Sequence, residues 1–209
     1  MYCIMEHRVI LLYVPFMGHI DSEKEENMEF VQPIRDAERI QDIAEYLRLK
    51  DEKYYVMFMT GIYSGLRVSD ILKLQVRDVR GKKSIKVKEK KTGKVKMFAI
   101  NPILLKVLDD YCKDKQDFDY LIPSAKTRGK AVDRTYAWKI IKEAGQYFGI
   151  NDLGTHSMRK TFGYHYYLQT KDIALLQKIF NHSHPSITLR YIGIEQSTID
   201  GALYNFKYK

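Results

Sequence analysis

The most informative stretch of the chain runs from Thr60 to Asp70 and reads TGIYSGLRVSD. It begins inside the apolar run Tyr54–Tyr63, which is about three helical turns long and predicts a helix buried in the core. Gly65 favours a turn where this helix ends. Arg67 then precedes a short helix that we expect over residues 69–74. Taken alone, this pattern also fits an ordinary surface arginine at a helix start.

The hydrophobic pattern on either side of this stretch predicts a mainly helical domain. Upstream, Ile40, Ile43, Ala44 and Leu47 recur with helical spacing, and Asp36 is placed to cap the helix that carries them. Downstream, further helices are expected at about 102–114, 133–148, 156–169, 172–180 and 196–205. In the last of these, apolar residues at 199, 202, 203 and 206 form a stripe that either folds back on its own core or docks on a neighbouring protomer.

Between two of these helices the hydrophobic period changes from that of a helix to that of a strand. Residues 84–88 and 95–100 alternate as half-exposed strands do, and Gly93 suits a hairpin turn between them. A third short strand is expected over Val76–Val79. The predicted fold class is therefore mainly α (α+β), with a helical core and a small antiparallel β-sheet.

The chain shows no linker-like composition after residue 35. We therefore expect a weakly specified lead segment over residues 1–34 and one domain over residues 35–209. The longest apolar run, Val9–Met17, has nine residues and contains Pro15, whereas a membrane helix needs about twenty. The sequence therefore predicts a cytoplasmic protein without a membrane span.

The charge balance narrows the classes of partner. The 209 residues include 35 Lys and Arg against 26 Asp and Glu, which gives a formal net charge of +9. Such an excess favours polyanions, either nucleic acid or an anionic membrane, but no basic amphipathic helix with an apolar insertion face supports the membrane. Cys3 and Cys112 are too few for a disulfide framework and lack the spacing of a zinc site.

Basic side chains gather at two further places. Lys91 lies on the expected hairpin, where the lysines at 82, 83, 86, 88, 90, 94 and 96 are candidate contacts to DNA phosphates or, alternatively, a solvated sheet face. His156 and Arg159 are three residues apart, so a helix would put them on one face within reach of one phosphate or carboxylate. Neither group is specific by itself.

A fourth group runs from Asn181 to Tyr191 and reads NHSHPSITLRY. His182 and His184 invite a metal-binding interpretation, but no companion carboxylates or HExxH motif accompany them. Pro185 is expected to interrupt any helix that would present them. We therefore expect no metal site here.

The order and spacing of the four groups resemble the catalytic domain of the tyrosine recombinase (phage integrase) family over about residues 35–205. The matching motifs are GLRVSD with Arg67, Lys91-Thr92-Gly93 between two strands, His156-x-x-Arg159, and the run that ends in Tyr191. Each motif is weak alone. Six positions in the right order, on the right local structures, make a specific joint signal.

The resemblance implies a site-specific DNA recombinase or integrase of a mobile element, which cuts and rejoins DNA through a 3′-phosphotyrosyl intermediate and needs neither a metal nor ATP. It implies double-stranded DNA and other recombinase protomers as partners, in a tetrameric synapse. It also implies six catalytic residues, namely Arg67, Lys91, His156, Arg159, His182 and Tyr191.

The resemblance implies a distinct role for each of these side chains. Tyr191 would attack the phosphate, while Arg67 and Arg159 would neutralise the charge that grows on its non-bridging oxygens. Lys91 would protonate the departing 5′ oxygen. His156 would assist proton transfer at the nucleophile, and His182 would hydrogen-bond the phosphate.

The chain departs from the family pattern at several positions. The family commonly has Glu at the position of Asp70 and Gly at that of Asn181, and often Pro at that of Ala99. Only about thirty-five residues precede the match, fewer than the roughly hundred-residue core-binding domain that closes a clamp around DNA in integrases. Two alternatives therefore stay open: a DNA-binding remnant or regulator without productive recombination, and a type IB topoisomerase that uses similar chemistry.

Overall fold

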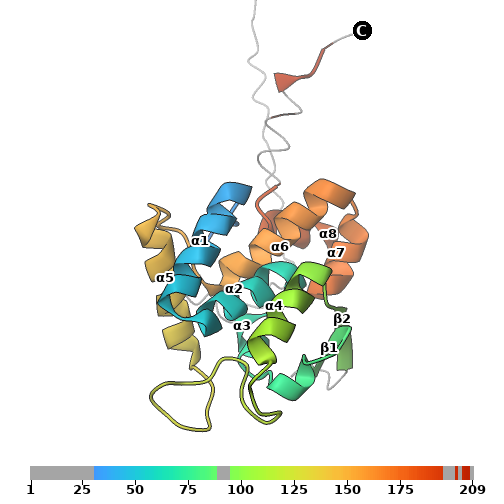
Figure 1. Ribbon diagram of the computed structural model, residues 1–209. Coiled ribbons are helices and arrows are strands. Elements are labelled where there is room, and N and C mark those ends of the chain that lie inside the picture. Colours follow the sequence, from blue (N-terminus) through green and yellow to red (C-terminus); the bar gives the residue numbers. More distant parts are fainter. Residues whose placement is uncertain (1–30, 89–94, 195–200, 202–203, 208–209) are drawn as a thin grey trace, which may run out of the picture.

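The computed structural model describes residues 31–88, 95–194, 201 and 204–207. The elements in chain order are α1 (Ala37–Lys50), α2 (Glu52–Ser64), α3 (Val68–Ile71), the 3₁₀ helix η1 (Val76–Asp78), β1 (Ser84–Lys88), β2 (Val95–Ala99), α4 (Pro102–Cys112), α5 (Arg134–Tyr147), α6 (Thr155–Thr170), α7 (Ile173–Phe180) and α8 (Pro185–Tyr191). Figure 1 shows the helices gathered in one body, with the two strands at its edge. The predicted fold class is confirmed.

Helix α2 runs through the middle of the helical body and packs against α1, α4 and α6 (Figure 1). Its side chains at Val56, Met57 and Phe58 are fully buried. Helix α6 approaches α2 closely at Gly61, where a Cβ atom would lie only 2.8 Å from the Cβ of Met158. Because α2 has neighbours on several sides, its sequence is apolar around most of its circumference.

Capping side chains begin the helices near the predicted positions. The Asp36 carboxylate accepts a hydrogen bond from the amide of Glu38 at 2.9 Å at the start of α1. At the start of α4, the Asn101 side chain accepts from the amide of Ile103 at 2.8 Å, and Pro102 occupies the first turn. The four helices predicted between residues 102 and 180 are confirmed, with boundaries that differ by at most two residues.

Strands β1 and β2 form an antiparallel pair in which Ile85 lies opposite Phe98 and Val87 lies opposite Lys96. The strand predicted over Val76–Val79 was wrong, because this segment is the 3₁₀ helix η1. The Asp78 carboxylate accepts a hydrogen bond from the amide of Gln75 at 2.8 Å, and this local bond favours a helical turn over an extended strand.

Some sequence predictions fall outside the described residues. They concern the lead segment up to residue 30, the hairpin turn at 89–94, which includes Lys91, and most of the helix expected over 196–205. Among the helices in the described ranges, none combines the length and the apolar character that crossing a bilayer requires.

Candidate active site

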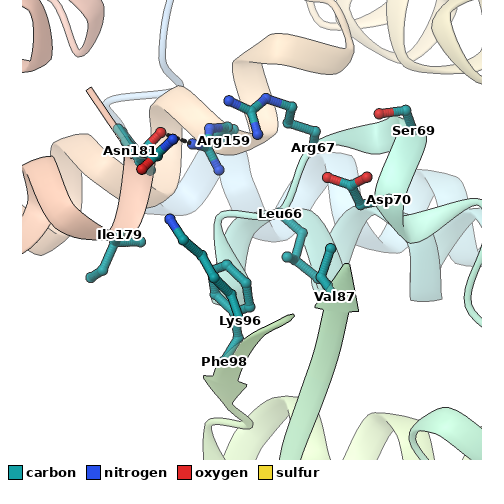
Figure 2. A pocket seen from close by; sticks show the side chains of 11 residues that line it. Leu66, Arg67, Ser69, Asp70, Val87, Lys96, Phe98, Arg159, Ile179 and Asn181 are labelled. Atoms are coloured by element: carbon teal, nitrogen blue, oxygen red, sulfur yellow. Dashed lines mark hydrogen bonds between the residues drawn. The ribbon is translucent and has the colours of Figure 1, made fainter. Parts of the chain in front are cut away.

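Arg67 lies where the chain leaves α2 and enters α3. Gly65 ends α2 in the left-handed region at φ 64°, and a Cβ atom there would lie 2.5 Å from the Phe162 ring, so both the conformation and the space favour glycine. The exposed Arg67 side chain borders a cavity of about 260 Å³ (Figure 2). The polar side chains that line this cavity are Arg67, Ser69, Asp70, Lys96, Arg159 and Asn181.

Arg159 connects three parts of the fold from the middle of α6. Its side chain is buried, with the residue only 4% exposed. The guanidinium donates hydrogen bonds to the carbonyl of Gly65 and, at 3.0 Å, to the carbonyl of Phe180 at the end of α7. Its carbon atom Cζ also lies 4.2 Å from the centroid of the Phe180 ring. Burial lowers the pKa of Arg159 to about 10, which leaves the side chain charged at neutral pH.

Tyr191, the last residue of α8, lies within the electrostatic reach of this arginine. Its phenol is partly buried. Burial raises the pKa of Tyr191, and the positive charges of Arg159 and Arg67 oppose that rise. The phenol is therefore protonated at neutral pH, beside two groups that stabilise its ionised form.

His182 packs against the Tyr191 ring. The two ring centroids lie 5.3 Å apart at an interplanar angle of 73°. The imidazole Nδ1 of His182 lies 3.0 Å from the hydroxyl of Thr188, which belongs to the same helix as Tyr191. Burial lowers the pKa of His182, and Arg159 and Arg67 lower it further, so the imidazole is neutral at pH 7.

His156 stands in the first turn of α6, three residues before Arg159. Burial lowers the pKa of His156, and the nearby cations, among them Arg159 and Arg67, add to the effect. The structure thus brings Arg67, His156, Arg159, His182 and Tyr191 into one basic neighbourhood. Of these five side chains, Arg67 and Arg159 line the cavity itself.

The segment around His184 agrees with the prediction that no helix presents both histidines. Pro185 occupies the first turn of α8, so His182 and His184 precede that helix and share no helical face. His184 caps that helix, since its Nδ1 accepts from the amide of Ser186 at 3.2 Å. Within the described ranges, no three His, Cys, Asp or Glu side chains are grouped so that they could hold a metal ion.

Lys160 is a neighbour of the tyrosine that the sequence motifs did not reveal. Its Nζ atom lies 5.2 Å from the centroid of the Tyr191 ring and donates to the carbonyl of Val31 at 2.7 Å. Nearby, Arg35 donates to the carbonyl of Gly193 at 3.1 Å. The extended segment before α1 is therefore fastened both to α6 and to the chain that follows Tyr191. The clue in the sequence was only that Lys160 immediately follows Arg159.

Two departures from the family pattern have a structural explanation. Asn181 ends α7 in the left-handed conformation at φ 56°, which glycine adopts freely and which asparagine tolerates better than most residues. Asp70 borders the cavity, and its negative charge raises the pKa of Arg159 against the effect of burial. A carboxylate at this position therefore helps to keep the buried guanidinium charged.

Comparisons with known proteins agree with this geometry. The model of the phage integrase family matches residues 33–197. The probable integrase/recombinase YoeC of Bacillus subtilis (strain 168) is 47% identical over 175 residues, which cover 84% of this chain and 96% of that protein. The tyrosine recombinase XerA of Pyrococcus horikoshii is 27% identical over 175 residues, which cover 82% of this chain and 59% of that protein.

Solved structures support the same fold. The crystal structure of XerA recombinase matches with a TM-score of 0.67 at 22% identity, over 85% of this chain and 67% of that chain. XerH recombinase bound to its palindromic difH substrate matches with a TM-score of 0.66 at 16% identity, over 84% and 53% of the two chains. Nothing in these comparisons favours a DNA-binding remnant over an enzyme. The chain therefore belongs to the phage integrase family and is a site-specific DNA recombinase.

Proposed function

We propose that this recombinase cleaves and rejoins double-stranded DNA with Tyr191 as its nucleophile. One observation carries the assignment of residues: Arg159 and Arg67 border the same cavity, and both are near enough to Tyr191 for their charges to lower its pKa against the effect of burial. A phosphate held by both guanidinium groups would lie next to the phenol oxygen. Arginine suits this task because its planar fork can donate two parallel hydrogen bonds to one phosphate.

In the cleavage step, the phenol oxygen of Tyr191 forms a bond to phosphorus, and the bond from phosphorus to the 5′ oxygen breaks. The products are a 3′-phosphotyrosyl ester and a free 5′-hydroxyl. Because one phosphoester replaces another, the bond energy is kept and no nucleotide cofactor is consumed. Arg67 and Arg159 stabilise the additional negative charge that develops on the non-bridging oxygens in the pentacoordinate transition state.

Two proton transfers balance this step. The phenol is protonated in the free enzyme because burial raises the pKa of Tyr191, so it must lose its proton during the attack. His156 assists that transfer as an acceptor, since burial lowers its pKa and keeps it neutral at pH 7. Lys91 donates a proton to the departing 5′ oxygen. His182 donates a hydrogen bond to the phosphate. When a 5′-hydroxyl from a second duplex attacks the ester, the same steps in reverse exchange the strands.

Strand exchange requires more than one protomer. We propose that several copies bind two duplexes and form a tetramer, and that they act in the cytoplasm, where the DNA lies. The surplus of 35 Lys and Arg over 26 Asp and Glu supports binding to DNA phosphates. We expect binding to weaken steeply as the salt concentration rises, because most contacts would be made to phosphates.

The test is a search for a covalent adduct with nicked suicide substrates. A pool of duplexes with randomised arms, each carrying a nick next to a potential cleavage position, is incubated with the protein and trapped with detergent. Cleavage releases a short oligonucleotide, so rejoining cannot occur and the protein stays attached to a DNA 3′ end. Sequencing the attached strands identifies the preferred site.

The Tyr191→Phe variant is the matched control, because it removes only the nucleophilic oxygen. We expect the wild-type protein to form an adduct and the variant to bind DNA without forming one. Salt-sensitive binding without any adduct from the wild-type protein would contradict the proposal and favour a DNA-binding regulator. An adduct that persists in Tyr191→Phe would show that another residue is the nucleophile.

A further inference from the structure

Strand β2 presents its side chains to the two faces of the sheet in an unexpected way. Lys96 and Phe98 line the cavity beside Arg67 and Arg159. Val95 and Met97 lie on the opposite face, where they are 60% and 65% exposed. An ordinary amphipathic strand would turn the valine and methionine inward and the lysine outward. The strand therefore places an ammonium group at the cavity while it leaves apolar side chains in solvent.

The Lys96 side chain places its charge in the same cavity as the two arginines. Figure 2 shows its side chain extending from β2 toward Arg159 and Asn181. Its Nζ atom lies 3.5 Å from the carbonyl oxygen of Lys178 in the last turn of α7, at the outer limit of a hydrogen bond. A contact this long is readily exchanged for a shorter, charge-assisted one.

The net positive charge of the cavity lining favours the binding of an anion. Its lining contains three cationic side chains, those of Arg67, Lys96 and Arg159, and one carboxylate, that of Asp70. The Asp70 carboxylate also lies 3.7 Å from the ammonium of Lys73 on its outer side. A phosphodiester carries one negative charge, and the transition state of phosphoryl transfer concentrates further charge on the equatorial oxygens. Together with the Asp70 carboxylate, the two arginines contribute a net charge of +1 to the lining. Part of the transition-state charge therefore remains unbalanced, and the ammonium of Lys96 can neutralise it.

We infer that Lys96 binds a non-bridging oxygen of the same phosphate that Arg67 and Arg159 hold, and stabilises the charge that develops there during cleavage. The inference rests on the proposed function and adds a catalytic residue to it. On binding DNA, the ammonium exchanges the carbonyl of Lys178 for the phosphate oxygen. This role differs from that of Lys91, which supplies a proton to the leaving 5′ oxygen; Lys96 keeps its proton throughout.

Lys86 provides a matched control on the same sheet. It lies on β1 opposite Met97, one residue pair away from the Val87–Lys96 pair, and its side chain is exposed on the face away from the cavity. If Lys86 contacts DNA, it therefore contacts a phosphate other than the one at Arg67 and Arg159, and saturating protein compensates for that loss of binding. Lys96→Met and Lys86→Met each remove one positive charge and keep a side chain of similar length. A general loss of attraction to DNA would affect both variants alike, whereas loss of a contact to the reacting phosphate would affect Lys96→Met alone.

The experiment measures single-turnover cleavage of a nicked suicide substrate at saturating protein. Loss of one preorganised charge contact lowers such rates by about 100-fold, so we expect that reduction for Lys96→Met and less than about 3-fold for Lys86→Met. Lys96→Arg should recover part of the rate. With a methylphosphonate at the scissile position, which lacks one non-bridging charge, the gap between wild type and Lys96→Met should shrink to less than about 10-fold, because less charge then needs to be neutralised.

Two results would overturn the inference. One is equal cleavage by Lys96→Met and Lys86→Met. The other is a gap between wild type and Lys96→Met that stays the same on the methylphosphonate substrate, which would mean that Lys96 supports the fold or contacts a different phosphate. In both cases a wild-type adduct that disappears in Tyr191→Phe would leave the proposed function intact. Failure of the wild-type protein to form any adduct would instead reject the proposed function itself.

Discussion

The imidazole Nδ1 of His182 lies 3.0 Å from the hydroxyl oxygen of Thr188. Thr188 is fully buried in α8, three residues before Tyr191. The contact ties the loop after α7 to the helix that carries Tyr191, and it restrains the rotation of the imidazole ring. Because Nδ1 is occupied in this way, Nε2 remains as the nitrogen that can serve a phosphate oxygen. We therefore regard Thr188 as a positioning residue for His182.

Thr188→Val should test this relationship, because valine keeps the shape of threonine and removes the hydroxyl. We expect the cleavage rate to fall by about 10-fold, as the imidazole loses its orientation. The free energy of unfolding should fall by about 1–3 kcal/mol, since Nδ1 loses its partner in a partly buried site. In a His182→Ala background, the same substitution should leave the cleavage rate unchanged. Equal effects on the rate in both backgrounds would show that Thr188 acts independently of His182.

Arg67 and Arg159 should differ sharply in their effect on stability, although both are expected to serve the same phosphate. Arg159→Ala removes a buried side chain that bonds the carbonyls of Gly65 and Phe180, so we expect the free energy of unfolding to fall by about 2–4 kcal/mol. Arg67→Ala changes an exposed side chain and should cost less than about 0.5 kcal/mol. Urea unfolding of the two variants, monitored by circular dichroism, measures the difference.

Cleavage assays on the same two variants separate stability from chemistry. Each should lower the rate by at least about 100-fold, because each removes a donor to the charged transition state. A folded Arg67→Ala variant that cleaved at the wild-type rate would remove Arg67 from the site. An Arg159→Ala variant as stable as the wild-type protein would contradict the bridging role of Arg159 between α2 and α7.

Hydrophobic periodicity was enough to predict the fold class, and the order of the motifs was enough to predict that Arg67, Arg159, His182 and Tyr191 gather in one place. Local patterns carry this information, since the helical spacing, the glycine turn and the His-x-x-Arg pair each lie within a few residues. The prediction of a strand over Val76–Val79 was wrong because the segment is short. Four residues are too few to distinguish an extended strand from a 3₁₀ turn, and the bond from the amide of Gln75 to the Asp78 carboxylate decided between them.

Contacts between distant parts of the chain could not be predicted in this way. The bond from Arg159 to Gly65 joins residues 94 positions apart, and the bond from Lys160 to Val31 joins residues 129 positions apart. Such contacts depend on how α2 and α6 pack, which periodicity does not specify. The inward direction of Lys96 was also invisible, because the alternation in β2 alone favours the opposite orientation.

Stability should depend on pH through His156 and His182. Burial lowers the pKa of both side chains below the ordinary value of 6.5, which the unfolded chain retains. The unfolded state therefore binds more protons, and the free energy of unfolding falls as the pH decreases through 6.5 toward the lower values of the folded state. We expect the double variant His156→Gln, His182→Gln to show a smaller loss of stability than the wild-type protein between pH 8 and pH 5.5, measured by urea unfolding. Identical pH profiles for the two proteins would contradict the neutral state of these imidazoles.

The left-handed residue at the end of α7 leads to a prediction about backbone strain. Asn181 has φ 56°, a conformation that costs a residue with a Cβ atom about 1 kcal/mol unless the side chain is Asn or Asp. We expect Asn181→Gly to change the free energy of unfolding by less than about 0.5 kcal/mol, whereas Asn181→Ala should lower it by about 1 kcal/mol. Asn181→Gly would also recreate the residue that is common in the family at this position.

Lys171 is the matched control for this prediction, because it ends α6 in the same conformation at φ 55° and its side chain is exposed. Lysine has no local hydrogen bond to offset the strain, so Lys171→Gly should raise the free energy of unfolding by up to about 1 kcal/mol. Asn181→Gly should give no such gain, since asparagine already tolerates the left-handed region. Equal gains at both positions would mean that Asn181 is strained like any other residue. It would then owe its place beside Arg159 to a contact of its amide with the phosphate, and Asn181→Gly would also slow cleavage.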